Sequence, residues 1–509
     1  MENSWLLLAL LYGAAIALIS KIVVGRYRTA RKLPPGPKPW PIIGNLNLLG
    51  PLPHRSLHLL SQKYGEIMLL KFGKFPVVIA SSPKMAEQFL KVHDANFASR
   101  PALAAGKYIS YDYSDVSFSP YSPYWRETRK IFMMEVLNAK KLDSFEQIRV
   151  EERRCLISRL QSLSRKPVVL RDELKRCNLS TICRILFRDK YFGESEEEKS
   201  IVDMHELREI VNEWLLLSGA FNIGDWIPWL NFLDLQGYVK RMKALRKKMD
   251  KFYDYVIDDH LAKRGGEKDY AKKDFVDVLL QIAEDPNAEV KLTRDCVKAL
   301  ITNLLVGGTD ASASAVEWAI NEILKQPSII EKAKAELNRV IGRNRWVEES
   351  DFTQLPYIDA IIIETFRLRP LGTLLAPRYA IHDCNVAGYD ILKGTTIIVS
   401  PWTIQRDPNL WDAPEEFVPE RFIGRDIDMS GSNFTLLPFG SGRRRCVGYN
   451  LGLKTVRTTL ANLLHGFELK LVEGMRPQDI CMDEQYGLST HPKHPLSIIL
   501  KPTLPAHLY

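Results

Sequence analysis

The sequence predicts a mainly α-helical protein with a minor β-sheet, folded as one domain behind an apolar N-terminal segment. Helical periodicity covers most of the chain, in runs at roughly 124–138, 143–163, 171–186, 201–218, 238–264, 293–326, 328–341, 356–369 and 449–464. Strand signals are found at 66–81 and 379–400, where β-branched residues stand between glycine turns. Pairing of these two distant segments would tie the chain together, which favours one integrated domain over several.

The N-terminal segment has the length and polarity of a membrane anchor. Residues 5–25 are almost wholly apolar, interrupted only by Ser20 and Lys21. As a helix, about 20 residues cover the ~30 Å of a bilayer core. The only charge before this run is Glu2, and the basic residues follow it, which argues against a cleaved signal peptide. We therefore expect residues 1–25 to form an uncleaved single-pass anchor that leaves the body of the protein in the cytosol.

Residues 26–41 read as a basic and proline-rich hinge between this anchor and the body, residues 42–509. Five prolines fall within the eight residues Pro34–Pro41. Such a segment is not helical and behaves as a stiff, extended spacer. A proline-rich ligand for a partner protein is the alternative interpretation. Farther along, the acidic run 194–198 and the polar stretch 264–273 are typical of solvated loops.

Charge and cysteine content exclude several classes of protein. The formal charge is +9, but residues 1–38 hold six basic residues against Glu2, so the remainder has 64 basic and 60 acidic residues. A nearly neutral body argues against nucleic-acid binding, which needs a basic surface. The seven cysteines form no C-x-x-C pair, and their number is odd, so neither a disulfide framework nor a cysteine zinc site is indicated.

One cysteine lies in a stretch that is suited to metal ligation. It is Cys446, in Leu437-Pro-Phe-Gly-Ser-Gly-Arg-Arg-Arg-Cys-Val-Gly448, directly before a predicted helix. The glycines let the backbone turn tightly and approach a flat group, and the helix start lowers the pKa of a nearby thiol. Arg444 is placed to pair with a carboxylate on such a group. A basic surface turn with a buried free cysteine is the alternative.

Three further patterns carry polar groups on helices. Trp125 and Arg129 lie four residues apart on one helical face, where both can donate hydrogen bonds to an anion. Glu364 and Arg367 follow the apolar run 360–363, which predicts a buried ion pair that needs further partners. The predicted helix 293–326 contains Leu304-Leu-Val-Gly-Gly-Thr-Asp-Ala-Ser312, whose two central glycines cost about 1 kcal/mol each relative to alanine. They either open a groove for a ligand or allow close helix packing.

The spacing Phe439-x-x-Gly442-x-Arg444-x-Cys446-x-Gly448 resembles the haem-binding signature of the cytochrome P450 superfamily, and the other patterns follow in that family's order over residues 33–500. The resemblance implies the cytochrome P450 fold and a haem b whose iron is bound by Cys446. It assigns the cofactor contacts to Trp125, Arg129, Arg378, Phe439 and Arg444. It also makes Arg421 the third member of the Glu364–Arg367 pair, fixing the cysteine loop.

The same resemblance assigns proton delivery to Asp310, together with Ser312 or Thr309. The chain departs from the family pattern at Ala311, where an alcohol side chain is usual. Ser312 or Thr309 then replaces that alcohol, or a substrate hydroxyl and ordered water relay the protons.

The implied activity is that of a plant A-type microsomal monooxygenase, which inserts one atom of O2 into a lipophilic specialised metabolite. The resemblance points to phenolic, flavonoid-like substrates or to terpenoids, and to the endoplasmic reticulum membrane. No G-x-G-x-x-G follows a predicted strand, so electrons are expected from NADPH through a separate reductase. Its basic docking face is assigned to Arg126, Lys130, Lys454 and Arg457, with ordinary solvated helix faces as the alternative.

Three other activities remain as alternatives: oxidative C–C cleavage, a haem-thiolate lyase or isomerase, and a membrane-tethered haem- or lipid-binding protein. By resemblance the substrate pocket is lined by residues 108–118, 214–221, 304–305, 371–375 and 486–488. This composition predicts an apolar pocket with several tyrosine hydroxyls.

Overall fold

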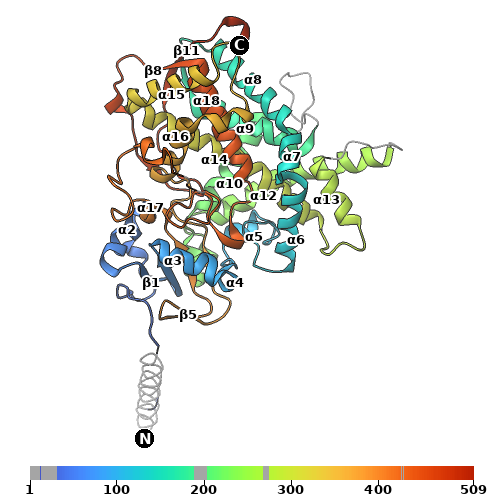
Figure 1. Ribbon diagram of the computed structural model, residues 1–509. Helices are drawn as coiled ribbons and strands as arrows, with labels where there is room; N and C mark the ends of the chain where they lie inside the picture. Colours follow the sequence, from blue (N-terminus) through green and yellow to red (C-terminus); the bar gives the residue numbers. More distant parts are fainter. Residues whose placement is uncertain (1–11, 13–30, 189–202, 267–273, 426, 428) are drawn as a thin grey trace.

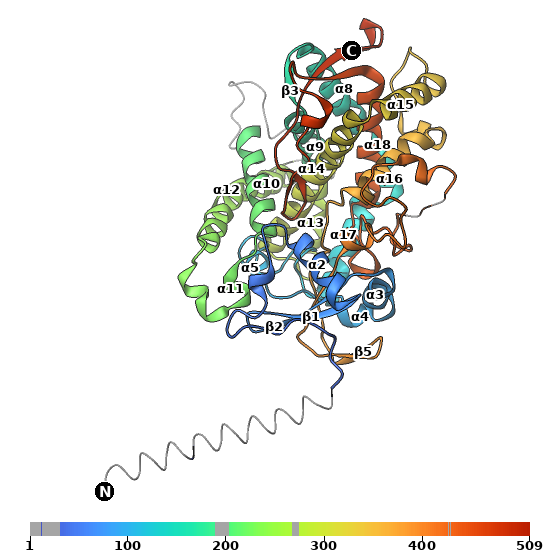
Figure 2. The ribbon, with the colours of Figure 1, turned by 90° about the vertical axis from the view of Figure 1, so that its left-hand side faces the viewer.

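A computed structural model describes residue 12 and residues 31–188, 203–266, 274–425, 427 and 429–509. The long helix α14 (Arg294–Lys325) runs through the middle of the molecule, and the other helices pack around it (Figures 1 and 2). It begins at Thr293, whose hydroxyl accepts the N–H of Cys296 and so satisfies one free backbone donor. Almost every side chain of α14 is buried, which explains why its apolar residues do not keep to one stripe.

Two apolar clusters divide the core along α14. Residues 296–306 pack with α9 (Leu170–Phe187), α10 (Met204–Gly219) and α12 (Tyr238–Gly266). Residues 313–324 pack with α15 (Pro327–Val340), α16 (Pro356–Leu368) and α18 (Tyr449–Gly466). The Gly-Gly-Thr-Asp-Ala-Ser segment, residues 307–312, falls between the clusters. The two glycines therefore mark the place where the core is interrupted.

The remaining α-helices are shorter or lie at the periphery. They are α2 (Pro53–Tyr64), α3 (Pro83–Glu87), α4 (Asp94–Phe97), α5 (Ala104–Tyr108), α6 (Pro123–Phe132), α7 (Ala139–Ser144), α8 (Glu146–Ser162), α11 (Ile223–Trp226), α13 (Phe275–Glu284) and α17 (Pro401–Ile404). Figure 1 shows α2, α3 and α4 beside the small sheet, at the end of the molecule far from the C-terminus.

The predicted pairing of distant strand segments is confirmed. A four-stranded sheet has the order β1 (Ile67–Phe72), β2 (Phe75–Ala80), β7 (Thr396–Val399), β4 (Arg378–Tyr379). Strands β2 and β7 run parallel, with Ile79 opposite Ile398, so segments distant in sequence share one sheet. A second sheet joins β3 (Pro167–Val169), β11 (Ser497–Pro502) and β8 (Phe467–Leu471). Two small antiparallel pairs complete the strands: β5 (Cys384–Val386) with β6 (Tyr389–Ile391), and β9 (Glu484–Gln485) with β10 (His491–Pro492).

Residues 32–39 of the predicted hinge form neither helix nor strand, and they contact the body. The carbonyl of Pro35 accepts the N–H of Leu69 on β1 at 2.7 Å. A Cβ on Gly36 would lie 1.9 Å from the carbonyl oxygen of Leu69, so only glycine permits this approach. The predicted anchor lies outside the described residues except for Tyr12. Within the part of the chain that the structure describes, no helix combines the length and apolar character needed to cross a bilayer.

Several predicted boundaries are wrong in detail. The run 143–163 is interrupted at Phe145, between α7 and α8. The run 124–138 changes from α-helix to a π-helical turn at Met133–Leu137. The stretch 264–273 was expected to be a loop, but α12 continues to Gly266, and residues 267–273 lie outside the described residues. The acidic run 194–198 also lies outside them. Helices α2 and α13 were not predicted.

Candidate active site

One cavity of about 510 Å³ lies between the cysteine loop and helix α14. By the same measure a single water needs roughly 15 Å³, so the cavity accommodates a large ligand. One wall contains Phe439, Cys446 and Gly452, and the opposite wall contains Gly307 and Ala311. The lining is mostly apolar. The cavity thus brings together the cysteine loop and the glycine-containing segment of α14.

The glycines of the cysteine loop are required by its backbone. Gly440 and Gly442 have φ angles of 66° and 68°, in the left-handed region. A Cβ on Gly442 would lie 2.1 Å from the carbonyl oxygen of Leu90. The N–H of Cys446 donates to the carbonyl of Phe439 at 2.9 Å, which closes the turn and places the thiol in the cavity wall.

Cys446 is better suited to form a thiolate than Cys177, the other cysteine in the cavity wall. Burial raises the pKa of the Cys446 thiol, but the N–H of Gly448 and the charges of Arg129 and Arg445 act in the opposite direction. Burial and the nearby Glu152 raise the pKa of Cys177 to about 12, and its thiol donates to the Glu152 carbonyl. A metal ligand is therefore expected at Cys446.

Trp125, Arg129 and Arg444 gather at one edge of the cavity, as the resemblance implied. The guanidinium of Arg444 stacks on the Trp125 ring at 4.2 Å, and both side chains donate to the carbonyl of Val116 at 3.0 Å. Arg129 donates to the carbonyl of Arg445 at 2.7 Å. Within the described residues, these donors thus contact backbone carbonyls and no carboxylate.

Arg378 lies behind this edge and outside the cavity lining. It pairs with the buried Asp94 at 2.5 Å and donates to the carbonyl of Ser441 at 2.7 Å. Asp94 also accepts the backbone N–H of Arg443, so it connects Arg378 to the cysteine loop. Sequence reasoning missed Asp94, because its partners Arg378 and Arg443 are 284 and 349 residues away along the chain.

Arg100 is a further cavity residue that the sequence analysis missed. Its guanidinium donates to the carbonyls of Ser117, Ala376 and Pro377. Burial, followed by the charge of Arg378, lowers the pKa of Arg100 to about 9. The sequence Phe97-Ala-Ser-Arg100-Pro offered one signal, an arginine in an otherwise apolar segment.

Among the described residues, the arginines at this edge outnumber the carboxylates near them, which are Asp94 and Asp115. Burial, then Arg100 and Arg378, lower the pKa of Arg444 to about 8. The nearby Asp115 is itself buried, and burial raises its pKa, so it is a poor counter-ion. A ligand with two carboxylates at this edge would relieve the excess positive charge. Haem, with two propionates and an iron that accepts a thiolate, fits this set of donors.

The two glycines of α14 serve different purposes. No atom lies within 4 Å of a Cβ built on Gly307, so this position opens the helix surface to the cavity. A Cβ on Gly308 would lie 2.4 Å from Cδ1 of Ile182, so this position allows α9 to pack closely. Both interpretations of the glycine pair apply, one to each residue.

The predicted proton-delivery residues do not share one surface. Ala311 and Ser312 line the cavity, whereas Thr309 and Asp310 do not. The hydroxyl of Thr309 donates to the carbonyl of Leu305 at 2.6 Å, and Asp310 pairs with Lys175 at 2.6 Å. Of the three candidates, Ser312 is the one whose side chain meets the cavity.

The buried charge lock predicted from Glu364, Arg367 and Arg421 is present. Glu364 and Arg367 are fully buried and form a bidentate pair at 2.6 and 2.9 Å. Arg421 donates to Glu364 at 3.1 Å. The remaining donors of Arg367 contact the carbonyls of Gln405, Pro414 and Glu416. These extra hydrogen bonds satisfy the charges, as burial requires.

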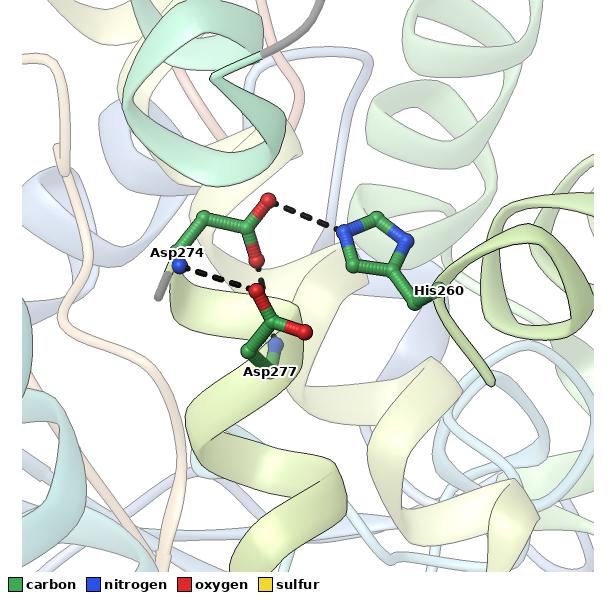
Figure 3. A group of neighbouring side chains, drawn as sticks. All are labelled: His260, Asp274 and Asp277. Carbon is green, nitrogen blue, oxygen red and sulfur yellow. Dashed lines mark hydrogen bonds and ion pairs between the residues drawn. The ribbon is translucent and has the colours of Figure 1, made fainter. Parts of the chain in front are cut away.

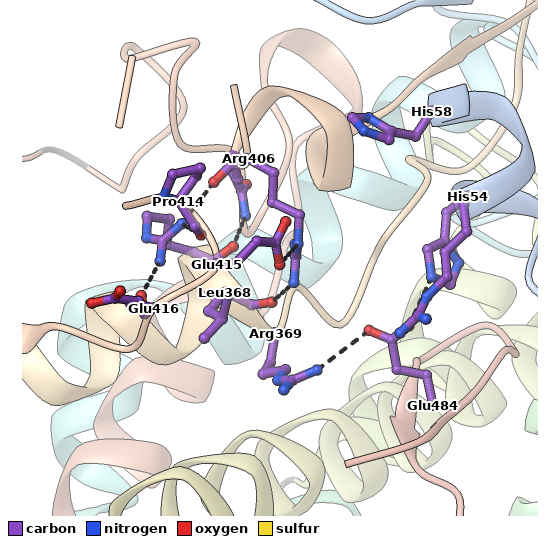
Figure 4. A network of polar contacts seen from close by, with 12 residues as sticks. His54, His58, Leu368, Arg369, Arg406, Pro414, Glu415, Glu416 and Glu484 are labelled. Atoms are coloured by element: carbon purple, nitrogen blue, oxygen red, sulfur yellow. Dashed lines mark hydrogen bonds and ion pairs between the residues drawn. The ribbon is translucent and has the colours of Figure 1, made fainter. Parts of the chain in front are cut away.

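Gln405 connects this lock to the cysteine loop, a link that the sequence did not reveal. Its side chain donates to the carbonyls of Phe366 and Arg367 and accepts the N–H of Leu437, where the loop begins. Figure 4 shows the surrounding network, in which Arg406 donates to the carbonyl of Leu368 and Arg369 approaches Glu484 at 3.8 Å.

The substrate side of the cavity only partly matches the expected pocket. Confirmed lining residues are 116–118, 218–221, Leu304, 371–372, 374–375 and 486–488. The prediction of several tyrosine hydroxyls is wrong: Tyr111 donates to Asp250 and Tyr113 to the carbonyl of Leu103, and neither lines the cavity. Within the described residues, Tyr486 is the tyrosine that does. Additional walls come from Leu49, Pro53, Leu57, Phe72, Asp225 and Trp226.

Comparison with known proteins agrees with this geometry. The family model "Cytochrome P450" matches residues 34–498. The chain is 42% identical to a trimethyltridecatetraene synthase of Zea mays, covering 97% of this chain and 95% of that one. It is 43% identical to a flavonoid 3'-monooxygenase of Petunia hybrida, with 95% of each covered.

A zebrafish cytochrome P450 structure with progesterone has the same fold, with a TM-score of 0.74 at 24% identity. The match covers 88% of this chain and 99% of that one. The family match spans nearly the whole chain, and the cysteine loop, Arg100, Arg129, Arg444 and the open face of α14 all line one cavity. The protein therefore belongs to the cytochrome P450 family of haem-thiolate monooxygenases.

Proposed function

We propose that this protein inserts one atom of O2 into a lipophilic small molecule, using electrons from NADPH that a separate flavoprotein reductase delivers. The observation that supports this most is the mostly apolar cavity that joins Cys446 to the open face of α14. Haem bound through a cysteine thiolate supplies the oxygen-activating chemistry. The chain itself must bind the substrate, exclude water and supply protons.

Binding falls to aromatic and aliphatic side chains with few polar groups. Phe118, Phe221 and Trp226 form apolar walls. The hydroxyl of Tyr486 has no hydrogen-bond partner within the described residues and belongs to the same lining, so it is available to orient a substrate oxygen. Such a combination of an apolar lining and a few placed polar groups is typical of small-molecule sites.

Proton supply is proposed to run through Ser312. Its hydroxyl is in the cavity wall beside Ala311, where the family pattern has an alcohol. Asp310 pairs with Lys175 and does not line the cavity, so it acts through water or through movement of its side chain. Thr309 remains the weaker candidate because its hydroxyl is bonded to Leu305.

The relatives' names and the cavity together support two substrate classes. The petunia relative is named for flavonoid hydroxylation, and the two maize relatives, named trimethyltridecatetraene and dimethylnonatriene synthases, are named for branched unsaturated hydrocarbons. A phenolic or a terpenoid substrate suits an apolar cavity with one tyrosine hydroxyl. We propose these two classes for the first assays.

The test uses membranes that contain the full chain and a reductase, with NADPH and isotopically heavy O2. A phenolic panel and a terpenoid-alcohol panel are offered separately, and products are followed by mass spectrometry. A product that carries one heavy oxygen is expected. Turnover that proceeds without NADPH and O2 would instead identify a lyase or isomerase and contradict the proposal.

Oxidative C–C cleavage is the second candidate, and Ala311 is the observation that favours it. Without an alcohol at this position, the proton donors in the cavity wall differ from the family pattern. The maize relatives are named for hydrocarbons, which retain no oxygen atom. In the same assay, cleavage would give a shortened, oxygen-free product from the terpenoid panel. The variant Ala311→Thr is then expected to shift products toward hydroxylation.

Membrane attachment and reductase docking complete the proposal. Residues 1–25 would anchor the chain in the endoplasmic reticulum membrane with its body in the cytosol; deletion of these residues should release it from carbonate-washed membranes. Of the four proposed docking cations, Lys130, Lys454 and Arg457 are paired with carboxylates. Arg126 is exposed and makes no ion pair within the described residues. Arg126→Glu is therefore expected to slow electron transfer most.

A further inference from the structure

A second cluster of ionisable side chains joins helix α12 to helix α13, away from the cavity. It consists of His260, Asp274 and Asp277, all buried and none part of the cavity lining. One nitrogen or oxygen from each residue lies within 4.8 Å of the others (Figure 3). These residue types in such proximity are suited to a metal ion, but the cluster alone is also typical of a buried ion pair.

Backbone groups hold one atom of each of the three side chains in place. Nδ1 of His260 donates to the carbonyl of Val256 at 2.7 Å, since a carbonyl can only accept. Asp274 accepts the N–H of Asp277 at 3.0 Å through Oδ1, and Asp277 accepts the N–H of Asp274 at 3.1 Å through Oδ2. Nε2 of His260 and Oδ2 of Asp274 face each other at 2.9 Å, and Oδ1 of Asp277 is the remaining oxygen of the three side chains.

Oδ1 of Asp277 is the atom that the fold does not explain. It is buried and has no hydrogen-bond partner, in a side chain that is only 2% exposed. Leaving a buried polar atom unpaired costs about 1–3 kcal/mol. Figure 3 shows this oxygen on the side of Asp277 that faces His260. A cation between the two side chains would satisfy it.

We propose that His260, Asp274 and Asp277 bind one divalent transition-metal ion, and that zinc is the ion they suit best. Zinc takes imidazole and carboxylate ligands in small coordination numbers, whereas magnesium and calcium prefer oxygen ligands alone. A histidine whose second nitrogen donates to a backbone carbonyl is the usual arrangement at such sites. Binding replaces the proton that His260 shares with Asp274, where Nε2 and Oδ2 are 2.9 Å apart. The ion clamps the end of α12 to the start of α13.

The test measures zinc on the haem-loaded full chain after dialysis with limiting zinc chloride. Elemental analysis is expected to give one zinc per haem iron in the wild-type protein. Asp277→Asn keeps an oxygen acceptor for the N–H of Asp274, so it should fold, and it should weaken zinc binding by at least about tenfold. His260→Gln should do the same. Removing zinc with a chelator should lower the melting temperature of the wild type and leave that of Asp277→Asn unchanged.

The matched control is His507→Gln, which removes an exposed histidine elsewhere and should bind zinc like the wild type. Zinc held by an exposed thiol such as Cys155 would persist in Asp277→Asn and in His260→Gln. That persistence would overturn the proposal. So would a melting temperature that the chelator does not change, with no zinc retained by the wild type.

Discussion

At the scale of single residues, Arg444 is held in place for a partner that carries negative charge. It donates to the carbonyls of Ala98, Val116 and Ser119 and lies near three other arginines. A hydrogen bond to a charged group contributes about 1.5–3 kcal/mol. Arg444 thus connects the cysteine loop to the binding of the cofactor.

The first prediction is that Arg444→Leu weakens haem binding by roughly ten- to a hundredfold, the equivalent of one charged hydrogen bond. Haem affinity of the variant is measured by titrating the haem-free protein and following absorbance. Arg476→Leu, at an exposed site far from the cavity, serves as the control. Equal affinities of the Arg444 variant and the wild type would show that this cluster does not hold the propionates.

Asp225 gives the cavity a titrating group on the substrate side. Its Oδ1 accepts from the N–H of Ala104 at 2.9 Å and from Asn222 at 3.2 Å. Burial nevertheless raises the pKa of Asp225 to about 6. The folded protein therefore holds this proton more tightly than the unfolded chain, and stability from this group is lost as pH rises toward about 6.

The second prediction follows from that direction. An apolar substrate should bind more tightly when Asp225 is neutral, so the dissociation constant should rise as pH increases through about 6. Asp225→Asn should remove this dependence, because the amide stays neutral and can still accept from Ala104. The measurement is a substrate titration at pH 5 to pH 8, with Asp285→Asn as control. A wild-type binding curve that does not change with pH would contradict the assignment.

At the scale of elements, the two glycines of α14 offer a matched pair. Gly308→Ala would press a methyl group against Ile182 on α9, whereas Gly307→Ala would place it in the cavity. Overpacking costs about 1–3 kcal/mol, and replacing a helical glycine by alanine gains about 1 kcal/mol.

The third prediction is that these two variants change different properties. Gly308→Ala should lower the free energy of unfolding. Gly307→Ala should leave it unchanged or raised, while weakening substrate binding. Urea unfolding and substrate titration are measured on both proteins. Loss of stability in Gly307→Ala and not in Gly308→Ala would contradict this, because it would mean that Gly307 is the glycine needed for close packing.

The buried ion pair of Glu364 and Arg367 on α16, joined by Arg421, connects this helix to the segment before the cysteine loop. Removing one member of a buried pair leaves an uncompensated charge, which costs about 3–5 kcal/mol. Arg367 would then keep only its backbone partners, Gln405, Pro414 and Glu416.

The fourth prediction is that Glu364→Gln destabilises the fold by several kcal/mol and also loosens haem, since Gln405 links the lock to Leu437. Glu87→Gln, which breaks an exposed pair with Lys91, is the control and should cost no more than about 0.5 kcal/mol. Unfolding free energies and haem retention test this. A small, equal effect in both variants would contradict this prediction, because it would mean that the Glu364–Arg367 pair contributes no more than an exposed pair.

At the scale of the whole molecule, the sequence predicted the long helices and the pairing of distant strands. Helix α14, for example, differs from its predicted range by one residue at each end. The helical periodicity of the sequence predicts α14 well because the run is 32 residues long. Helices α2 and α13 are both amphipathic, but they have only 12 and 10 residues, so the sequence pattern of each is too short to identify.

The site was predictable where its chemistry is local in sequence. The cysteine loop and the Glu364–Arg367 pair each reside within one short segment. Asp94, Arg100 and Gln405 were not predictable, since their roles arise only when the fold brings them to Arg443, Arg444 and Leu437. The prediction of tyrosine hydroxyls in the pocket failed for the same reason, since Tyr111 donates its hydroxyl to Asp250 on α12 and does not line the cavity.

The most direct test is to determine which cysteine sulfur binds the haem iron. Two cysteines line the cavity, Cys446 and Cys177, so they form a natural pair. X-ray absorption at the iron edge is measured on the haem-loaded wild type, Cys446→Ser and Cys177→Ser. If Cys446 binds the iron, a sulfur neighbour of iron is found in the wild type and in Cys177→Ser, and none in Cys446→Ser. Sulfur that remains in Cys446→Ser, or is lost in Cys177→Ser, would contradict it.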